Sequence, residues 1–125
     1  MSVHKVLIVE DSRATRELLA AALGELDGVE VHLAISGFEA LKVLPRHRFA
    51  LIITDINMPD INGLELINFV KKNPHYKETP LFVVTTEGRP QDRDRGLQLG
   101  AAEYVVKPFE PADISALVKR YLKLG

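Results

Sequence analysis

Residues 6–12 read Val6-Leu7-Ile8-Val9-Glu10-Asp11-Ser12, and this short stretch decides the fold class. Four consecutive apolar residues rich in valine and isoleucine are typical of a strand that is buried on both faces, as in a parallel sheet. Two carboxylates follow at once, and the serine after them is a favoured N-cap of a helix. The stretch therefore predicts a buried strand that ends in acidic residues and leads into a helix.

Four more apolar runs follow along the chain, at residues 29–35, 49–53, 81–84 and 104–106. The runs at 49–53 and 81–84 are continuous, which again favours strands buried on both faces. In the run at 29–35, Val, Val and Leu alternate with Glu, His and Ala, so we expect a less buried edge strand there.

Helical patterns separate these runs. Apolar residues recur with a period of about 3.6 over residues 14–26 and 114–122. We expect Ser12 to cap the first of these helices and Gly28 to end it. Shorter helices are expected at 38–44, ended by Pro45, and at 64–72.

The segment 88–100 predicts the weakest helix, because Gly96 lies inside it and little of its surface is apolar. With this segment, strand and helix alternate five times. This order indicates an α/β fold with a parallel sheet and right-handed crossovers. Five strands suit the doubly wound, flavodoxin-like order 2-1-3-4-5, flanked by five helices.

Length and composition narrow the class of protein. The chain has 125 residues, of which 46% are hydrophobic and 26% charged, so we expect one domain over residues 1–125. Its 16 Lys and Arg nearly balance 17 Asp and Glu, so no charge excess favours nucleic acid or membrane lipid. It has no cysteine, no apolar run near the ~20 residues that cross a bilayer and no secretion signal, so we expect a cytoplasmic protein.

Polar residues follow four of the predicted strands. Glu10 and Asp11 come after the first, Asp55 after the third, Thr85 after the fourth and Lys107 after the fifth. Ligands of an open parallel sheet bind beyond the carboxyl ends of its strands. In the order 2-1-3-4-5 the first and third strands are neighbours, so the three carboxylates should share one crevice, which Thr85 and Lys107 close.

Three carboxylates in one crevice repel one another, and a hard divalent cation relieves the repulsion. Mg²⁺ prefers oxygen ligands and keeps several waters, which leaves room for a phosphate. An aspartate can act as a nucleophile and form an aspartyl phosphate. The four histidines show no ligand spacing, and we assign all of them to the surface or to turns.

Five short motifs, taken together and in order, are specific: Leu7-Ile8-Val9-Glu10-Asp11-Ser12, Ile53-Thr54-Asp55-Ile56-Asn57-Met58-Pro59, Asn62-Gly63-Leu64-Glu65-Leu66, Val83-Val84-Thr85-Thr86 and Tyr104-Val105-Val106-Lys107-Pro108-Phe109. In these motifs, and over essentially its whole length, the chain resembles the CheY-like receiver domains of two-component response regulators. The resemblance implies that Asp55 accepts a phosphoryl group from a sensor histidine kinase or a histidine phosphotransfer domain. It also implies Mg²⁺ as cofactor, held by Asp11, Asp55 and the carbonyl of Asn57, with Glu10 acting through water.

The resemblance further implies that Lys107 pairs with Asp55 or its phosphoryl group, and that Lys107-Pro108 is a cis peptide. The hydroxyl of Thr85 would move to the phosphoryl oxygen and Tyr104 would turn inward. Both movements would change the surface formed by the fourth helix, the fifth strand and the fifth helix. Such a chain is a phosphoacceptor switch that catalyses only its own phosphorylation and dephosphorylation, so it is not a classical enzyme.

Several functions stay open at this point. We expect a stand-alone receiver without an output domain, acting on an unknown protein target, with chemotaxis as one pathway. A phosphorelay intermediate or a phosphate sink fits the same residues. A phosphatase of the haloacid-dehalogenase type is disfavoured, because its acid/base aspartate is replaced here by Asn57. A scaffold with a degenerate site is disfavoured because Asp11, Asp55, Thr85 and Lys107 are all present.

Overall fold

Each apolar run forms a strand. Each strand is followed by a helix, and the helices between strands return the chain to the end of the sheet at which the strands begin. The computed structural model describes residues 3–124. Its elements are β1 (His4–Val9), α1 (Arg13–Gly24), β2 (Val29–Ala34), α2 (Gly37–Val43), the 3-10 helix η1 (Leu44–Arg46), β3 (Leu51–Thr54), α3 (Gly63–Lys72), β4 (Leu81–Thr85), α4 (Pro90–Leu99), β5 (Glu103–Val106) and α5 (Pro111–Leu122). All four strand pairings are parallel and the order is β2-β1-β3-β4-β5, which confirms the predicted topology.

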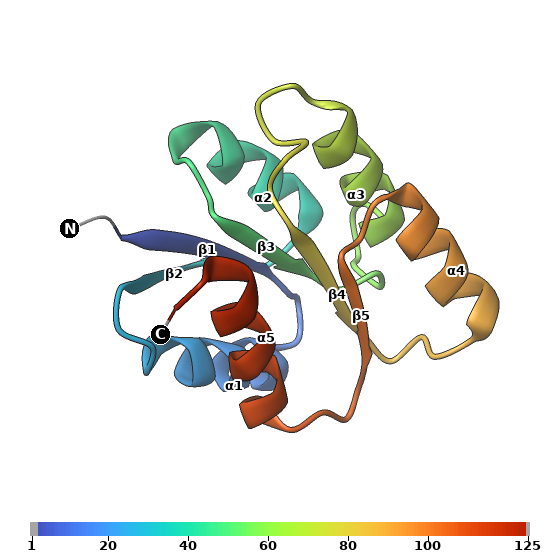
Figure 1. Ribbon diagram of the computed structural model, residues 1–125. Coiled ribbons are helices and arrows are strands. Elements are labelled where there is room, and N and C mark those ends of the chain that lie inside the picture. Colours follow the sequence, from blue (N-terminus) through green and yellow to red (C-terminus); the bar gives the residue numbers. More distant parts are fainter. Residues whose placement is uncertain (1–2, 125) are drawn as a thin grey trace.

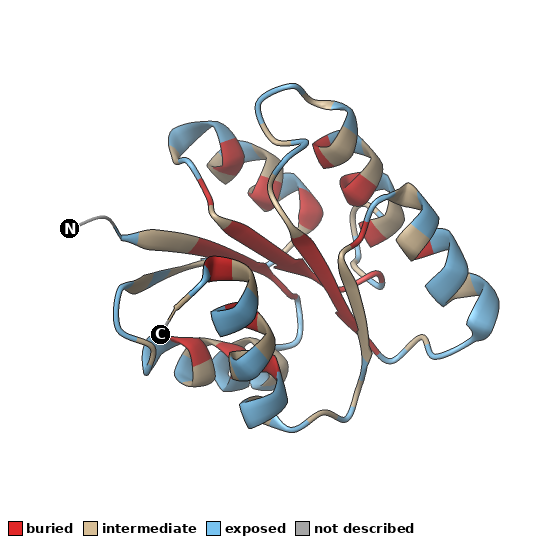
Figure 2. Cartoon of the chain, in the orientation of Figure 1, coloured by how far each residue is buried: buried red, intermediate tan, exposed pale blue. Residues whose placement is uncertain are grey.

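The continuous apolar runs form the three central strands. Every residue of β3 and β4 is buried, as are the last four of β1 (Figure 2). The edge strands β2 and β5 are more exposed, which confirms the prediction for residues 29–35. On β2, however, Leu33 is 44% exposed whereas His32, on the opposite face, is half-buried. Val29 and Val31 on the apolar face still pack against the core, so this face is uncovered only at its Leu33 end.

Helices cover both faces of the sheet (Figure 1). Side chains alternate along β1, so that Val6 and Ile8 pack with α1 and α5, whereas Leu7 and Val9 pack with α2 and α3. This arrangement divides the core into two layers, one on each side of the sheet. Within residues 3–124, no helix is long and apolar enough to cross a membrane.

Two helix ends differ from the sequence prediction. Ser12 caps α1 through its side chain, as expected, but the helix ends at Gly24 rather than near Gly28. Gly28 has φ +81° and forms the turn into β2, and Leu26 packs into the core from that turn. Pro45 ends α2 but lies inside η1, because proline is tolerated in the first turn of a helix.

Candidate functional site

The carboxyl ends of β1 and β3 bring three carboxylates together. The amide of Asp55 donates to the carbonyl of Val9 (3.2 Å), which ties the two strand ends side by side. One carboxylate oxygen each from Glu10, Asp11 and Asp55 lies within 4.8 Å of the others. Glu10 and Asp55 are 1% and 6% exposed, and Asp11 is exposed to solvent. The structure thus groups the three acids that the sequence analysis assigned to one crevice.

Lys107 is the internal counter-ion of this cluster. Its Nζ donates to Oε1 of Glu10 (2.8 Å) and to Oδ2 of Asp55 (3.0 Å), and its side chain is 13% exposed. Burial lowers the pKa of Lys107, but the two carboxylates outweigh it and hold the pKa above the ordinary 10.5. Lys107-Pro108 is a cis peptide bond, as the family resemblance implied.

The surroundings of Glu10 disfavour its ionised form. Burial raises the pKa of Glu10 above its ordinary 4.5, and the negative charge of Asp55 adds to this effect. The hydrogen bonds from Lys107 and from the amide of Ser12 (3.0 Å) oppose the rise without cancelling it. The ionised form of Glu10 is therefore short of positive charge, and a cation placed beside it would be stabilised.

Backbone amides fix the carboxylate of Asp55. Its Oδ1 accepts from the amides of Ile56 (2.6 Å) and Asn57 (3.1 Å), which leaves Oδ2 for Lys107. The start of α3 lies directly against this segment, since the amide of Gly63 donates to the carbonyl of Ile56 (2.8 Å). A Cβ atom on Gly63 would lie 2.1 Å from the carbonyl oxygen of Asp55, so only glycine allows this approach.

The two predicted switch residues, Thr85 and Tyr104, both contact Glu87. The buried hydroxyl of Thr85 accepts from the amide of Glu87 (3.3 Å), and the hydroxyl of Tyr104 donates to the Glu87 carbonyl (2.5 Å). Burial raises the pKa of Tyr104 above 10.0. The Tyr104 ring lies against Gly96 of α4, where an added Cβ would be 3.2 Å from the ring. Tyr104 therefore links β5 to α4 and to the loop after β4.

Comparison with known proteins identifies the family. Residues 6–119 match the response regulator receiver domain. The chain belongs to this family. It is 37% identical to the chemotaxis response regulator CheY4 of Vibrio cholerae (TM-score 0.87), over 96% of this chain and 99% of that one. It is 34% identical to a response regulator of Chloroflexus aurantiacus (TM-score 0.90), over 98% of this chain and 99% of that one.

A third relative is longer. The receiver domain is 32% identical to the transcriptional regulatory protein SrrA of Staphylococcus aureus, over 96% of this chain and 48% of SrrA. The chain thus spans about half the length of the curated relatives it matches. Receiver domains are phosphoacceptor switches of two-component signalling rather than classical enzymes, and they bind Mg²⁺ at their acidic site. The donors here are carboxylate oxygens, which suit Mg²⁺ better than metals that prefer imidazole or thiolate.

Two contacts of this receiver domain were missed by the sequence analysis. Arg16 donates from Nη1 to the carbonyls of Glu10 (2.9 Å) and Asp11 (3.3 Å), and so fixes the loop between β1 and α1. The side-chain amide of Asn57 donates to the carboxylate of Glu87 (2.8 Å). The position of Arg16 in the first helical turn is the one sequence signal that could have suggested the first contact.

Two of the histidines that were assigned to the surface or to turns, His32 and His47, pack against one another at the β2 edge. Their rings lie 4.3 Å apart between centroids, and both rings meet the buried ring of Phe49 edge-on. The two imidazoles are half-buried and extend the core at the β2 edge. Among the residues that the structure describes, the acidic cluster consists of carboxylates alone.

Proposed function

We propose that this receiver domain accepts a phosphoryl group on Asp55 from the phosphohistidine of a sensor histidine kinase or a histidine phosphotransfer domain. An oxygen of Asp55 attacks phosphorus, the P–N bond breaks, and its electron pair returns to the imidazole, which takes up a proton. The observation that carries this proposal is the buried carboxylate of Asp55, 3.0 Å from Lys107 and grouped with two further acids. Phosphoryl transfer depends mainly on positioning and on neutralising charge, and this site provides both.

The residues present fit a magnesium ion. Asp11, Asp55 and the carbonyl of Asn57 would hold it, and Glu10 would act through a bound water. When bound, the ion neutralises negative charge on the carboxylates and on the incoming phosphoryl oxygens. Lys107 keeps its ammonium beside Asp55 and pairs with the phosphoryl group after transfer. Catalysis is limited to the formation and hydrolysis of the domain's own aspartyl phosphate.

Phosphorylation would change the surface formed by α4, β5 and α5. Thr85 and Tyr104 both contact Glu87, so a movement of the Thr85 hydroxyl toward a phosphoryl oxygen alters the surroundings of Tyr104. Tyr104 packs on α4 and belongs to β5, and Val106 at the end of β5 is 41% exposed. We propose that residues 1–125 act as one receiver unit whose output is the contact of this surface with a protein partner. The match to nearly all of a chemotaxis response regulator supports this output.

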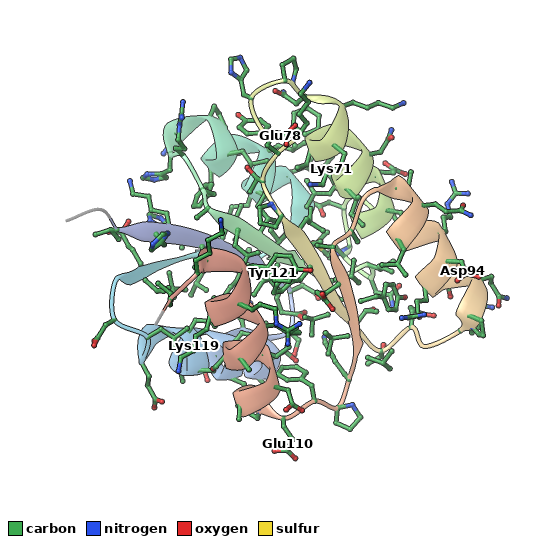
Figure 3. All side chains as sticks on the ribbon, in the orientation of Figure 1. Lys71, Glu78, Asp94, Glu110, Lys119 and Tyr121 are labelled. Carbon is green, nitrogen blue, oxygen red and sulfur yellow. The ribbon has the colours of Figure 1, made fainter. Side chains whose placement is uncertain are left out.

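A labelling experiment tests the acceptor. The wild type is treated with acetyl phosphate and Mg²⁺, and we expect about one hydroxylamine-labile phosphoryl group per chain by intact mass. Asp55→Asn should abolish the label, whereas Asp94→Asn, on the exposed side of α4 (Figure 3), should leave it unchanged. Stoichiometric label on Asp55→Asn would refute the acceptor assignment. Full labelling in excess chelator would remove the metal from the mechanism.

A capture experiment separates the switch from a relay or a phosphate sink. Beryllofluoride-loaded protein serves as bait, and the unloaded protein and Asp55→Asn serve as matched controls. Selective capture of a protein that is neither a kinase nor a phosphotransfer domain supports the switch. Capture of kinases and phosphotransfer domains alone favours a relay or a sink.

A further inference from the structure

Asp60 ties the segment after Asp55 to the beginning of α2. Its Oδ1 accepts from the amides of Gly37 (3.0 Å) and Ile61 (2.8 Å), and its Oδ2 accepts from the amide of Phe38 (2.8 Å). Gly37 and Phe38 are the first two residues of α2, where helical amides have no partner within the helix. One carboxylate therefore caps a helix that lies more than twenty residues earlier in the chain.

Two glycines let both helices approach this segment, which we call the acceptor loop (residues 55–62). A Cβ on Gly37 would lie 2.1 Å from Cγ1 of Ile61, so a larger residue would require the Ile61 side chain or α2 to shift. Gly63 provides the equivalent close approach on the side of α3. The acceptor loop is thus held between two helices, and Asp60 supplies its polar attachment to α2.

The attachment is charged under all ordinary conditions. Burial raises the pKa of Asp60, but the amide hydrogen bonds from Phe38, Ile61 and Gly37 outweigh it and hold the pKa at about 2. Hydrogen bonds to an ionised acceptor are roughly twice as strong as those between neutral groups. The carboxylate of Asp60 is therefore ionised at neutral pH, and its bonds to the α2 amides are of this stronger kind.

We propose that Asp60 is a positioning residue for phosphoryl transfer, holding the acceptor loop against α2 so that the loop presents its backbone to Asp55 and the metal. This inference rests on the proposed function. The amides of Ile56 and Asn57 already bind Asp55, and the carbonyl of Asn57 is a proposed magnesium ligand. Asn57 lies three residues before Asp60 in the same loop. If the loop moved away from α2, the amides that bind Asp55 and the carbonyl of Asn57 would therefore be displaced.

Three variants test the inference. Asp60→Ala removes all three hydrogen bonds, and we expect the magnesium dissociation constant to rise about tenfold, the lower end of the range for residues that support a metal ligand. Asp60→Asn should have a smaller effect, because its amide oxygen can still accept from Gly37 and Ile61. Asn62→Ala is the matched control. It removes the cap of α3 from the same loop (2.8 Å to the amide of Leu64) but leaves the contact with α2 intact.

Calorimetric titration with Mg²⁺ gives the dissociation constants, and labelling by acetyl phosphate at rising Mg²⁺ gives the rates. For Asp60→Ala we expect slow labelling at low Mg²⁺ that largely recovers at saturation, whereas Asn62→Ala should follow the wild type. Urea unfolding reports the stability lost by each variant, so a general loss of structure is separated from a misplaced loop.

The outcomes separate the two proposals. If the wild type binds Mg²⁺ and is labelled on Asp55, but Asp60→Ala and Asp60→Asn bind Mg²⁺ as tightly as Asn62→Ala, the positioning role is refuted and the proposed function stands. If the wild type neither binds Mg²⁺ nor becomes labelled, both proposals fail. If Asp60→Ala does not fold, the comparison of Asp60→Asn with Asn62→Ala decides the question.

Discussion

Replacing Lys107 with methionine tests whether its ammonium is the main counter-ion of the site. Methionine keeps much of the length of the side chain and removes the charge. Glu10 and Asp55 then lose hydrogen bonds of 2.8 and 3.0 Å and remain buried at 1% and 6% exposure. The variant therefore leaves two desolvated carboxylates, and Asp11 beside them, without the ammonium that forms their ion pairs.

The size of the effect follows from this geometry. Breaking a buried ion pair by removing one partner costs about 3–5 kcal/mol. The Lys107 side chain is 13% exposed, so water can enter the vacated space, and Glu10 can take up a proton more readily than a free glutamate. Both responses reduce the loss, and we expect Lys107→Met to lower the free energy of unfolding by about 3 kcal/mol in chelator. Since small domains have about 5–15 kcal/mol in total, the variant should still fold.

Magnesium should act in the opposite direction on this variant. Lys107 and a bound Mg²⁺ ion would neutralise the same carboxylates. The ammonium of Lys107 would therefore lie close to the ion and repel it. We expect Lys107→Met to bind Mg²⁺ about tenfold more tightly, a gain of about 1.4 kcal/mol. The stability difference from the wild type should therefore shrink when Mg²⁺ is added.

The measurement is urea unfolding followed by far-ultraviolet circular dichroism, because the chain has no tryptophan. Unfolding in chelator and in saturating Mg²⁺ gives the stability changes, and calorimetry gives the affinities. Lys119→Met is the matched control, since Lys119 is an exposed lysine on α5 (Figure 3). If Lys107→Met is as stable as Lys119→Met in chelator, or binds Mg²⁺ no more tightly than the wild type, the counter-ion role is wrong.

Two further predictions concern the backbone and the pH dependence. Gly63→Ala should lose at least about 3 kcal/mol of stability, because its Cβ would lie 2.1 Å from the carbonyl oxygen of Asp55. Gly24→Ala, with nothing within 4 Å of the added Cβ, should instead gain about 0.5–1 kcal/mol, and equal effects of the two changes in urea unfolding would contradict this. The folded-state pKa of Lys107 exceeds 10.5, so its stabilising effect is complete below pH 10.5 and is lost as the pH rises through the folded value. We expect the free energy of unfolding of the wild type to exceed that of Lys107→Met by less as the pH rises through 10.5. A difference that grows with pH in this range would contradict the raised pKa of Lys107.

The sequence predicts the grouping of the main charged residues because the topology of the sheet determines it. Glu10, Asp11, Asp55 and Lys107 all follow strands, and parallel strands bring their carboxyl ends to one edge. Once the order 2-1-3-4-5 is known, no loop geometry is needed to place these four residues near one another. The alternating run of β2 and the continuous runs of β1, β3 and β4 likewise separate an edge strand from the central strands, because burial on one or two faces selects the pattern.

Contacts that depend on loop conformation lie beyond such reasoning. Asp60 meets Gly37 only because the acceptor loop folds back toward α2, and no periodicity in the sequence records that turn. The contact between Asn57 and Glu87 depends on two side-chain directions in different loops. The sequence contains two glycines after the apolar stripe, Gly24 and Gly28, and its pattern does not decide which of them ends α1.

Our proposal assigns to Thr85 the step that couples phosphorylation of Asp55 to the rest of the domain. Its buried hydroxyl accepts a bond of 3.3 Å from Glu87, and within residues 3–124 that hydroxyl makes no donating hydrogen bond. A hydroxyl that accepts one hydrogen bond can also donate one, and a charged acceptor that arrives within its reach is favoured. On our proposal, phosphorylation of Asp55 supplies strong acceptor oxygens at this edge of the sheet. On the same proposal, Thr85 would then donate to the phosphoryl group, and the free energy of that new contact would be available to shift Glu87 and, through it, Tyr104.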